Sequence, residues 1–378
     1  MEDLVHLRRF LHAAPELSGR ETETAREVFV RLDDLAPDRL WTKLGGHGVA
    51  AEFQGKAPGP TVLVRAELDA LPIHEQSELP YSSTVPGCAH LCGHDGHMTI
   101  LMGLARRIAQ EPLASGRFIA LFQPAEETGE GARAVCADPR FPELRPDYAF
   151  ALHNLPGTAL GTVALRDGTF NCASRGIVVN LSGATAHAAH PEDGKSPALA
   201  MCALLKRLTH IHEDPSLPES GLRLSTVVHA NLGEVAFGTS PGEAVLMATL
   251  RAEHDATLEA MAKLAEDSAH ALAQEHGLRA EVAWRDRFEA SVNTPAAAAL
   301  IRAAANQIGA PVEELKGPFR WSEDFGALGA QATHSAMFGL GAGVAHPPLH
   351  STTYDFPDPL IERGIALFEA AVRGCASR

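Results

Sequence analysis

The stretch TVLVRAEL, residues Thr61–Leu68, is an apolar run bounded by turn-forming residues, and it predicts a buried β-strand. Two later runs, Phe118–Gln123 and Tyr148–His153, have the same character. Met98–Ala109 lies between the first two runs, and its apolar residues recur at helical spacing. Strands that alternate with helices are typical of an α/β layer structure, so we expect a largely parallel sheet.

The region between residues 174 and 286 has a different order of predicted elements. It comprises, along the chain, a strand at 176–181, a helix at 197–208, strands at 222–228 and 245–251, a helix at 257–275 and a strand at 279–284. This β-α-β-β-α-β order is the signature of a ferredoxin-like unit. Further helices are predicted at 296–308 and 360–372. We therefore expect a discontinuous domain, residues 1–173 and 287–378, that carries an inserted α+β domain, residues 174–286.

The composition argues against several classes of protein. A formal charge of −15 disfavours a nucleic-acid partner, which usually requires a basic face. The sequence has no run of about 18 apolar residues and begins without an apolar signal segment, so neither a membrane span nor secretion is predicted. The six cysteines are dispersed and do not form a disulfide framework. We expect a soluble protein of the reducing cytoplasm.

Residues suited to metal binding and proton transfer follow each predicted strand of the first region. Glu67 and Asp69 end the first strand, Glu126-Glu127 follow the second, and His153 ends the third. Ligands of open α/β sheets bind beyond the carboxyl ends of the strands. The sequence therefore predicts a functional site at this edge of the sheet.

The motif Cys92-Gly-His94-Asp95-Gly-His97 lies at the start of a predicted helix. A thiolate and two imidazoles within six residues suit a transition metal. The alternative is a capped helix start, with Asp95 as the cap and the other residues incidental. That alternative explains a single histidine well and this cluster poorly.

Three further features carry weaker signals. Neighbouring residues of extended backbone point to opposite sides, so one carboxylate of Glu126-Glu127 could bind a metal while the other faces a reacting water. A solvated acidic loop is the alternative. His350 lies in a loop stiffened by two prolines, which favours a ligand role. His187 lies among small residues, and an exposed loop histidine explains it equally well.

At these residues the sequence resembles the M20 metallopeptidase family, in the amidohydrolase branch that includes hippurate, N-acyl-amino-acid and auxin-conjugate hydrolases. The resemblance covers nearly the whole chain. Its matching segments are Leu7–His12, Pro15–Ser18, Arg65–Ile73, Cys92–His97, Phe122–Glu127, Leu152–Asn154, Ser322–Phe325, Leu349-His350 and Tyr354–Phe356. The resemblance implies a mixed-sheet metallopeptidase catalytic domain with an inserted ferredoxin-like lid.

The resemblance also implies the functional residues. Two divalent metal ions per chain are expected, zinc first, with manganese, cobalt or nickel as alternatives. The metal-ligand positions of the family correspond to Cys92, His94, Glu127, His153 and His350. Catalytic roles are expected for Glu126, the general base, and for Asp69 and His187, and substrate binding for Arg251 and His187. A homodimer, or a higher oligomer, through the lid domain is expected by the same analogy.

Three positions depart from the pattern of this branch. Glu67 replaces its usual Asp, Gly238 replaces a residue that commonly contacts substrate, and Thr185-Ala186 replace a Gly-Gly pair before the lid histidine. The metal cluster is intact while the lid is altered. We expect the chemistry to be kept and the substrate range to differ.

The resulting hypothesis is a metal-dependent amidohydrolase that cleaves the amide bond of a small N-acyl amino acid or related conjugate. A metal-bound water attacks the carbonyl, and Glu126 takes its proton. Hydrolysis of a dipeptide or an aminobenzoyl conjugate is the nearest alternative. A thiol hydrolase that uses Cys92 and a non-catalytic binding protein on the same fold are the other two.

Overall fold

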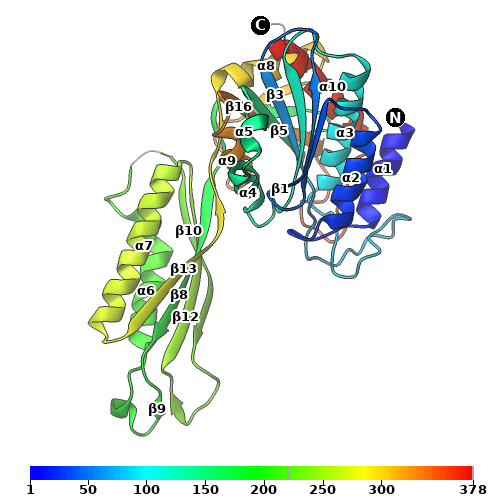
Figure 1. Ribbon diagram of the computed structural model, residues 1–378. Coiled ribbons are helices and arrows are strands. Elements are labelled where there is room, and N and C mark those ends of the chain that lie inside the picture. Colours follow the sequence, from blue (N-terminus) through cyan, green and yellow to red (C-terminus); the bar gives the residue numbers. More distant parts are fainter. Residues whose placement is uncertain (219–220, 377–378) are drawn as a thin grey trace. The chain divides into compact units, whose positions relative to one another are not determined.

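The computed structural model describes residues 1–218 and 221–376 (Figure 1). The chain forms two compact units, each with its own hydrophobic core. The first unit consists of Met1–Phe170, Ser291–Phe319 and Glu323–Arg378, and the second of Asn171–Ala290 with Arg320–Ser322.

The first unit contains an eight-stranded mixed sheet in the order β1-β2-β4-β3-β5-β16-β6-β15. Its strands are β1 (Arg39–Leu44), β2 (Gly48–Gln54), β3 (Thr61–Glu67), β4 (Arg117–Gln123), β5 (Tyr148–Pro156), β6 (Val163–Leu165), β15 (Val312–Glu314) and β16 (His334–Gly343). The central strands β4, β3, β5 and β16 are parallel, whereas β2 pairs antiparallel with β1 and β4, and β6 pairs antiparallel with β16 and parallel with β15. The mixed α/β fold is therefore confirmed, while the expectation of a largely parallel sheet holds for its centre.

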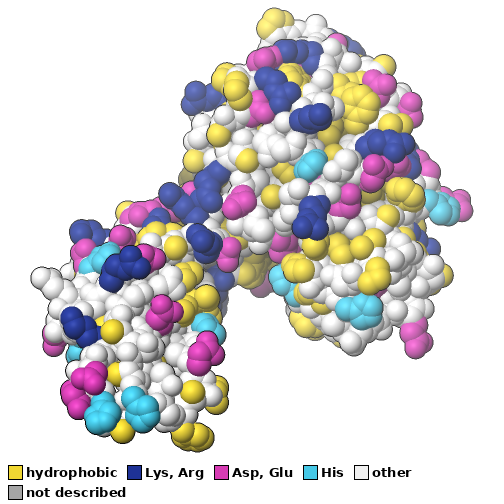
Figure 2. All heavy atoms as spheres, turned by 60° about the horizontal axis from the view of Figure 1, so that its bottom comes forward, with side chains coloured by type: hydrophobic (Ala, Val, Ile, Leu, Met, Phe, Trp, Pro, Cys, Tyr) yellow, Lys and Arg dark blue, Asp and Glu magenta, His cyan; other side chains and the backbone are white. Residues whose placement is uncertain are grey.

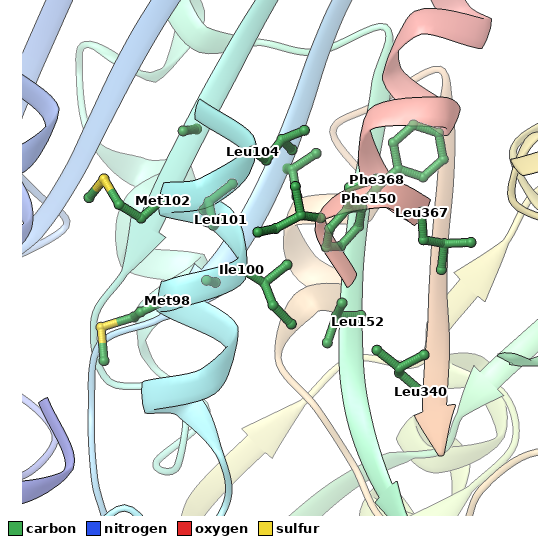
Figure 3. Packing of buried hydrophobic residues seen from close by; sticks show 14 of the residues in the cluster. Met98, Ile100, Leu101, Met102, Leu104, Phe150, Leu152, Leu340, Leu367 and Phe368 are labelled. Carbon is green, nitrogen blue, oxygen red and sulfur yellow. The ribbon is translucent and has the colours of Figure 1, made fainter. Parts of the chain in front are cut away.

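Helices cover this sheet (Figure 1). They are α1 (Glu2–Ala13), α2 (Thr22–Asp33), α3 (His94–Gln110), α4 (Gly131–Ala137), α5 (Phe141–Leu144), α8 (Pro295–Gln307), α9 (Phe325–Gly329) and α10 (Pro359–Ala376). Helices α1, α2, α3, α8 and α10 contribute to one core cluster. In Figure 3, Ile100 and Leu104 of α3 lie near Phe150 and Leu152 of β5, with α10 alongside. This packing fixes the start of α3 at the carboxyl ends of the parallel strands.

The second unit is a four-stranded antiparallel sheet in the order β10-β12-β8-β13. Its elements are β8 (Ala173–Ser182), β9 (Ala186–His187), α6 (Ala198–His210), β10 (Arg223–Leu232), β11 (Thr239–Ser240), β12 (Glu243–Ala252), α7 (Asp255–Glu275) and β13 (Arg279–Phe288). Apolar residues of α6 and α7 share one core with the sheet. The predicted β-α-β-β-α-β order is confirmed, with a small β9–β11 ribbon added.

Two short strands, β7 (Gly168–Asn171) and β14 (Ser291–Asn293), pair with each other. None of the helices within the described residues is both long and apolar enough to cross a membrane.

Candidate metal centre

The carboxyl ends of β3, β4 and β5 place three predicted site segments at one edge of the sheet. The parallel pairing sets Glu67 opposite Gln123. Leu68 N donates to the Gln123 carbonyl at 2.8 Å, which extends this alignment past the strand end. His153 lies near the end of β5. The expectation from parallel-strand geometry therefore holds for this edge.

The start of α3 approaches the same edge through a glycine. Gly93 is the N-cap and has a left-handed φ of 93°. A Cβ at this position would lie 2.3 Å from the Asn154 side-chain nitrogen, so only glycine fits. That nitrogen donates to the Cys92 carbonyl at 2.7 Å. The close approach of the two backbones brings the Cys92 thiol beside His153.

The five predicted metal-ligating residues converge. The donor atoms of Cys92, His94 and His153 lie within 4.8 Å of one another, and so do those of Cys92, Glu127 and His350. Cys92 Sγ is 3.4 Å from His153 Nε2, and Glu127 Oε1 is 3.9 Å from His94 Nε2. Two overlapping groups of three donors, which share one thiol, can hold two neighbouring cations.

Hydrogen bonds orient two of the imidazoles for ligation. His94 Nδ1 donates to the Asp69 carbonyl at 2.8 Å, and His153 Nδ1 donates to the Asn154 carbonyl at 2.9 Å. In a neutral ring, each bond places the proton on Nδ1 and leaves Nε2 available to a cation, which is the usual arrangement of a metal-ligating histidine. Without a cation, burial lowers the pKa of His94, but the surrounding carboxylates outweigh it and raise the pKa to about 10. His94 Nε2 and Glu127 Oε1 are buried and have no hydrogen-bond partner in the described part of the chain. Buried polar atoms normally have partners, so a cation fits the chemistry of these donors.

His97 differs from His94 although the sequence motif contains both. Its Nδ1 donates to Glu67 at 2.8 Å, and its Nε2 accepts from the Asn154 backbone N at 3.2 Å. Both ring nitrogens are therefore satisfied by protein groups. Glu67, which departs from the family pattern, reaches both His97 and the buried Arg65.

The expectation that Glu126 and Glu127 point to opposite sides of extended backbone is wrong. Ala125 has a left-handed φ of 50°, and Gly129 N donates to the Glu126 carbonyl at 2.7 Å, so the pair lies in a turn. Glu126 Oε2 and Glu127 Oε1 are each 3.9 Å from His94 Nε2. The turn directs both carboxylates toward the same imidazole.

Asp69 lies beside the cluster and holds several of its parts. Its Oδ2 accepts from Ser18 Oγ at 2.7 Å and from Glu127 N at 3.0 Å. Its backbone carbonyl orients His94. These contacts suit a residue that positions the ligands.

His350 belongs to a turn after Pro347-Pro348. Its φ of 65° is left-handed, its side chain is 49% exposed, and its Nε2 lies 4.0 Å from Glu127 Oε1. The His350 N donates to the Leu91 carbonyl at 2.8 Å, which ties this turn to the segment before Cys92.

Burial and crowding shift the pKa values of the site without a cation. Burial raises the pKa of Glu127 to about 7, although the nearby His94 lowers it. Burial also holds the pKa of Glu126 well above its usual range, and the charges of Glu323 and Glu127 raise it further. Burial also raises the pKa of the Cys92 thiol, and the two glutamates reinforce it. Burial lowers the pKa of His153 to about 3. A bound cation would favour the ionised thiol and carboxylates and so lower the pKa values of Cys92, Glu126 and Glu127, and it would keep His153 neutral.

The sequence analysis did not single out Arg65, a buried and positively charged side chain next to the site. Arg65 in β3 is fully buried; it donates to Glu323 and Asp324 at 2.6 Å each and also pairs with Glu67. Asp324 N donates to Glu126 Oε1 at 3.4 Å, so this group reaches the predicted base. A charged residue inside the apolar run TVLVRAEL was the available signal.

A second buried network surrounds Asp95, which forms no cap at the start of α3. His12 lies between two carboxylates, with Nδ1 2.9 Å from Asp95 Oδ2 and Nε2 3.2 Å from Glu75 Oε1. Burial alone would lower the pKa of His12, but these hydrogen bonds outweigh it and raise the pKa from 6.5 to about 10. His12 is therefore an imidazolium in the folded protein at neutral pH.

The variant His12→Gln is expected to be less stable than the original chain by an amount that depends on pH. A group whose pKa is raised on folding stabilises fully below its unfolded value of 6.5, and this stabilisation is lost as the pH rises toward about 10. The difference in unfolding free energy should be roughly 3–5 kcal/mol below pH 6.5 and shrink above it. Urea unfolding of both chains at several pH values measures this. A constant difference from pH 6 to pH 10 would contradict the charged state of His12.

The remaining predicted site residues belong to the second unit. His187 is exposed on β9, and its Nδ1 accepts from Ala189 N at 3.1 Å. Figure 2 shows several histidines on the surface of this unit. Arg251, near the end of β12, is half-buried and donates to Ser322 Oγ at 2.8 Å and to the Arg320 carbonyl at 3.1 Å. Apart from its two chain neighbours, no described residue has a heavy atom within 4 Å of the place that a Cβ would take at Gly238.

Comparisons with known proteins agree with this arrangement. Residues 63–374 match the model of the peptidase family M20/M25/M40. The chain is 32% identical over 377 residues to N-acetyl-L-cysteine deacetylase of Bacillus subtilis, covering 98% of this chain and 88% of the relative. It is 29% identical over 362 residues to N-acetyldiaminopimelate deacetylase of Exiguobacterium sibiricum, covering 95% of each.

A solved structure shares the fold over its whole length. The B. subtilis YXEP protein, described as a dinuclear metal-binding peptidase of the M20 family, superposes with a TM-score of 0.83 at 23% identity, covering 100% of this chain and 98% of that one. The family match spans most of the chain, and the deacetylase of B. subtilis aligns over nearly all of it. The chain therefore belongs to the peptidase family M20/M25/M40.

Proposed function

We propose that this protein hydrolyses the amide bond of a small N-acyl amino acid, with divalent cations held by Cys92, His94, Glu127, His153 and His350. The observation that carries the proposal is the convergence of these donors, in which the buried Nε2 of His94 and Oε1 of Glu127 form no hydrogen bond with any described residue. The names of the relatives, deacetylases of N-acetyl-cysteine and N-acetyldiaminopimelate, support the substrate class.

The chemistry follows from the donor set and from Glu126. When bound, a pair of divalent cations lowers the pKa of water toward about 7 and stabilises negative charge on a carbonyl oxygen. Glu126 takes a proton from the attacking water and returns it to the leaving amine. Asp69 keeps His94 and the Glu127 backbone in place for this step.

The inserted region, residues 174–286, is proposed as the lid, and residues 1–173 and 287–378 as the catalytic part. His187 would donate to the oxyanion, and Arg251 would hold the substrate carboxylate. The open space at Gly238 supports a substrate range that differs from that of close relatives. A homodimer through the lid, zinc or manganese as the metal, and a cytoplasmic location belong to the same proposal.

A thiol mechanism has one observation in its favour, the 3.4 Å approach of Cys92 Sγ to His153 Nε2. The pKa of the Cys92 thiol is raised by burial and by the nearby Glu127 and Glu126, which opposes formation of a nucleophilic thiolate. The metal-dependent mechanism is therefore favoured.

Removal of divalent metal is expected to abolish amine release from N-acyl amino acids. The chain would be tested on acetyl, benzoyl, indoleacetyl and aminobenzoyl conjugates, and on dipeptides, with a chelator and again after zinc, manganese, cobalt or nickel is restored. Metal-dependent release of amine would identify both the acyl group that is cleaved and the cation that supports cleavage. Activity that survives the chelator would support the thiol mechanism, and bound metal without release from any conjugate would support a binding protein.

A further inference from the structure

The N-terminal helix α1 contains a buried arginine that takes no part in the proposed chemistry. Arg8 is fully buried; its Nε donates to Asp358 Oδ1 at 2.8 Å and its Nη1 to Asp355 Oδ1 at 2.6 Å. Its guanidinium lies 4.6 Å from the centre of the Tyr81 ring, and Tyr81 OH donates to Asp355 Oδ2 at 2.8 Å. A buried arginine is stable only when paired in this way.

Both aspartates belong to the segment that carries His350. Tyr354 in this segment donates its hydroxyl to the Asn154 side chain, and His346 Nε2 donates to the Asp355 carbonyl at 2.8 Å. Arg8 therefore ties a helix more than 300 residues away in the sequence to the loop of a predicted metal ligand.

His350 needs such support more than the other ligands do. It has a left-handed φ of 65° and a half-exposed side chain, whereas Cys92, His94 and His153 are buried at the ends of α3 and β5. Left-handed backbone is strained for a residue other than glycine and persists only where the surroundings impose it. A ligand on a loop is placed accurately only if its supporting contacts are fixed.

We propose that Arg8 is a positioning residue for His350 and thereby sets the affinity of the cation held by Cys92, Glu127 and His350. This inference rests on the proposed metal site. It distinguishes the two donor groups by distance: Arg8 bonds to Asp358 and Asp355 at 2.8 Å and 2.6 Å, whereas its contact beside His94 is the longer one, 3.7 Å from Nη1 to Asp95 Oδ2. Loss of Arg8 should weaken one cation and spare the other.

The neighbouring arginine provides a matched control. Arg9 is 41% exposed and reaches the same segment through Asp358 Oδ2 at 2.7 Å. Among the described residues its ion pair is with Asp358 and not with Asp355, and its guanidinium lies 4.6 Å from the centre of the Tyr81 ring. The variant Arg9→Gln removes one positive charge from the same helix but leaves the buried Arg8 in place.

The experiment is a zinc titration of the metal-free full chain by calorimetry, with bound metal counted by elemental analysis. His350→Ala identifies the binding event that belongs to the His350 group. In Arg8→Gln we expect that event to weaken at least about tenfold, the effect typical of residues that orient metal ligands, while the other event is unchanged. Asp355→Asn should weaken the same event, and Arg9→Gln should match the original chain.

The outcomes separate this inference from the proposed function. If the original chain binds no zinc, the titration is repeated with manganese, cobalt and nickel, and a chain that binds none of the four contradicts the proposed function. Zinc binding by the original chain together with an unchanged His350-dependent event in Arg8→Gln and Asp355→Asn overturns the inference. Equal weakening of both events in a folded Arg8→Gln or Asp355→Asn also overturns it, because it indicates a general structural role.

Discussion

Replacement of Glu126 by glutamine is expected to lower kcat at least about a hundredfold and to leave the metal content unchanged. The amide has the shape of the carboxylate but cannot accept a proton from water. KM should change little, because the lost interaction acts in proton transfer and not in substrate binding.

The geometry around Glu126 supports this expectation. One oxygen accepts from Asp324 N at 3.4 Å, and the other lies 3.9 Å from His94 Nε2. The carboxylate is thus held at the edge of the donor cluster. An amide can keep the first of these contacts, so the variant should fold with the site intact.

The adjacent residue gives the control. Glu127 belongs to the donor group of Cys92 and His350, and its carboxylate also lies 3.9 Å from His94 Nε2, so Glu127→Gln is expected to lose bound metal together with activity. Glu126→Gln should lose activity alone. Activity within a few-fold of the original chain in Glu126→Gln would refute the role of general base, and loss of metal from that variant would make Glu126 a ligand.

The sequence predicted the elements whose patterns are local. The strands β3, β4 and β5 are short apolar runs, and α6 and α7 have clear helical spacing, so the inserted ferredoxin-like unit could be read from their order. The central strand β16 was missed because its sequence, HSAMFGLGAG, is rich in glycine and alanine. Its strand character depends on pairing with β5, which lies far away along the chain.

The candidate site was predictable to a similar extent. Cys92 and His94 could be found from one motif. The spacing does not distinguish His94 from His97, because what sets His97 apart is its hydrogen bond to Glu67, which lies on another element. The turn at Glu126 depends on the left-handed Ala125, for which sequence gives no strong signal. Arg65 and Glu323 are 258 residues apart, so their pairing follows only from the fold.

Replacement of Arg65 by methionine is expected to destabilise the chain by about 3–5 kcal/mol at neutral pH, the usual cost when one partner of a buried ion pair is removed. Arg65 bonds to Glu323, Asp324 and Gln123 and pairs with Glu67, all within the interior. Methionine fills part of the volume and leaves Glu67, Glu323 and Asp324 without the positive charge that they share. Urea unfolding with a chelator present in every sample measures the effect without a contribution from bound metal.

The pH dependence of this loss tests its electrostatic origin. In the original chain Arg65 opposes the effect of burial and lowers the pKa values of Glu67 and Glu323 below their usual 4.5. Groups with depressed pKa values stabilise above the unfolded value and lose that stabilisation as the pH falls. The difference between Arg65→Met and the original chain should therefore be largest above about pH 5 and diminish below pH 4.5.

Two further variants separate charge from packing at Arg65. Arg65→Lys keeps the positive charge but not the forked donor geometry, so it should recover part of the lost stability. The double variant Arg65→Met/Glu323→Gln also lacks one of the carboxylates that Arg65 neutralises. It should therefore recover part of the stability that Arg65→Met loses. If Arg65→Met is as stable as the original chain at neutral pH, the buried cluster does not stabilise the fold. Equal loss at pH 4 and pH 7 would instead assign the effect to packing, because a cost that arises from unpaired carboxylates must fall once they are protonated.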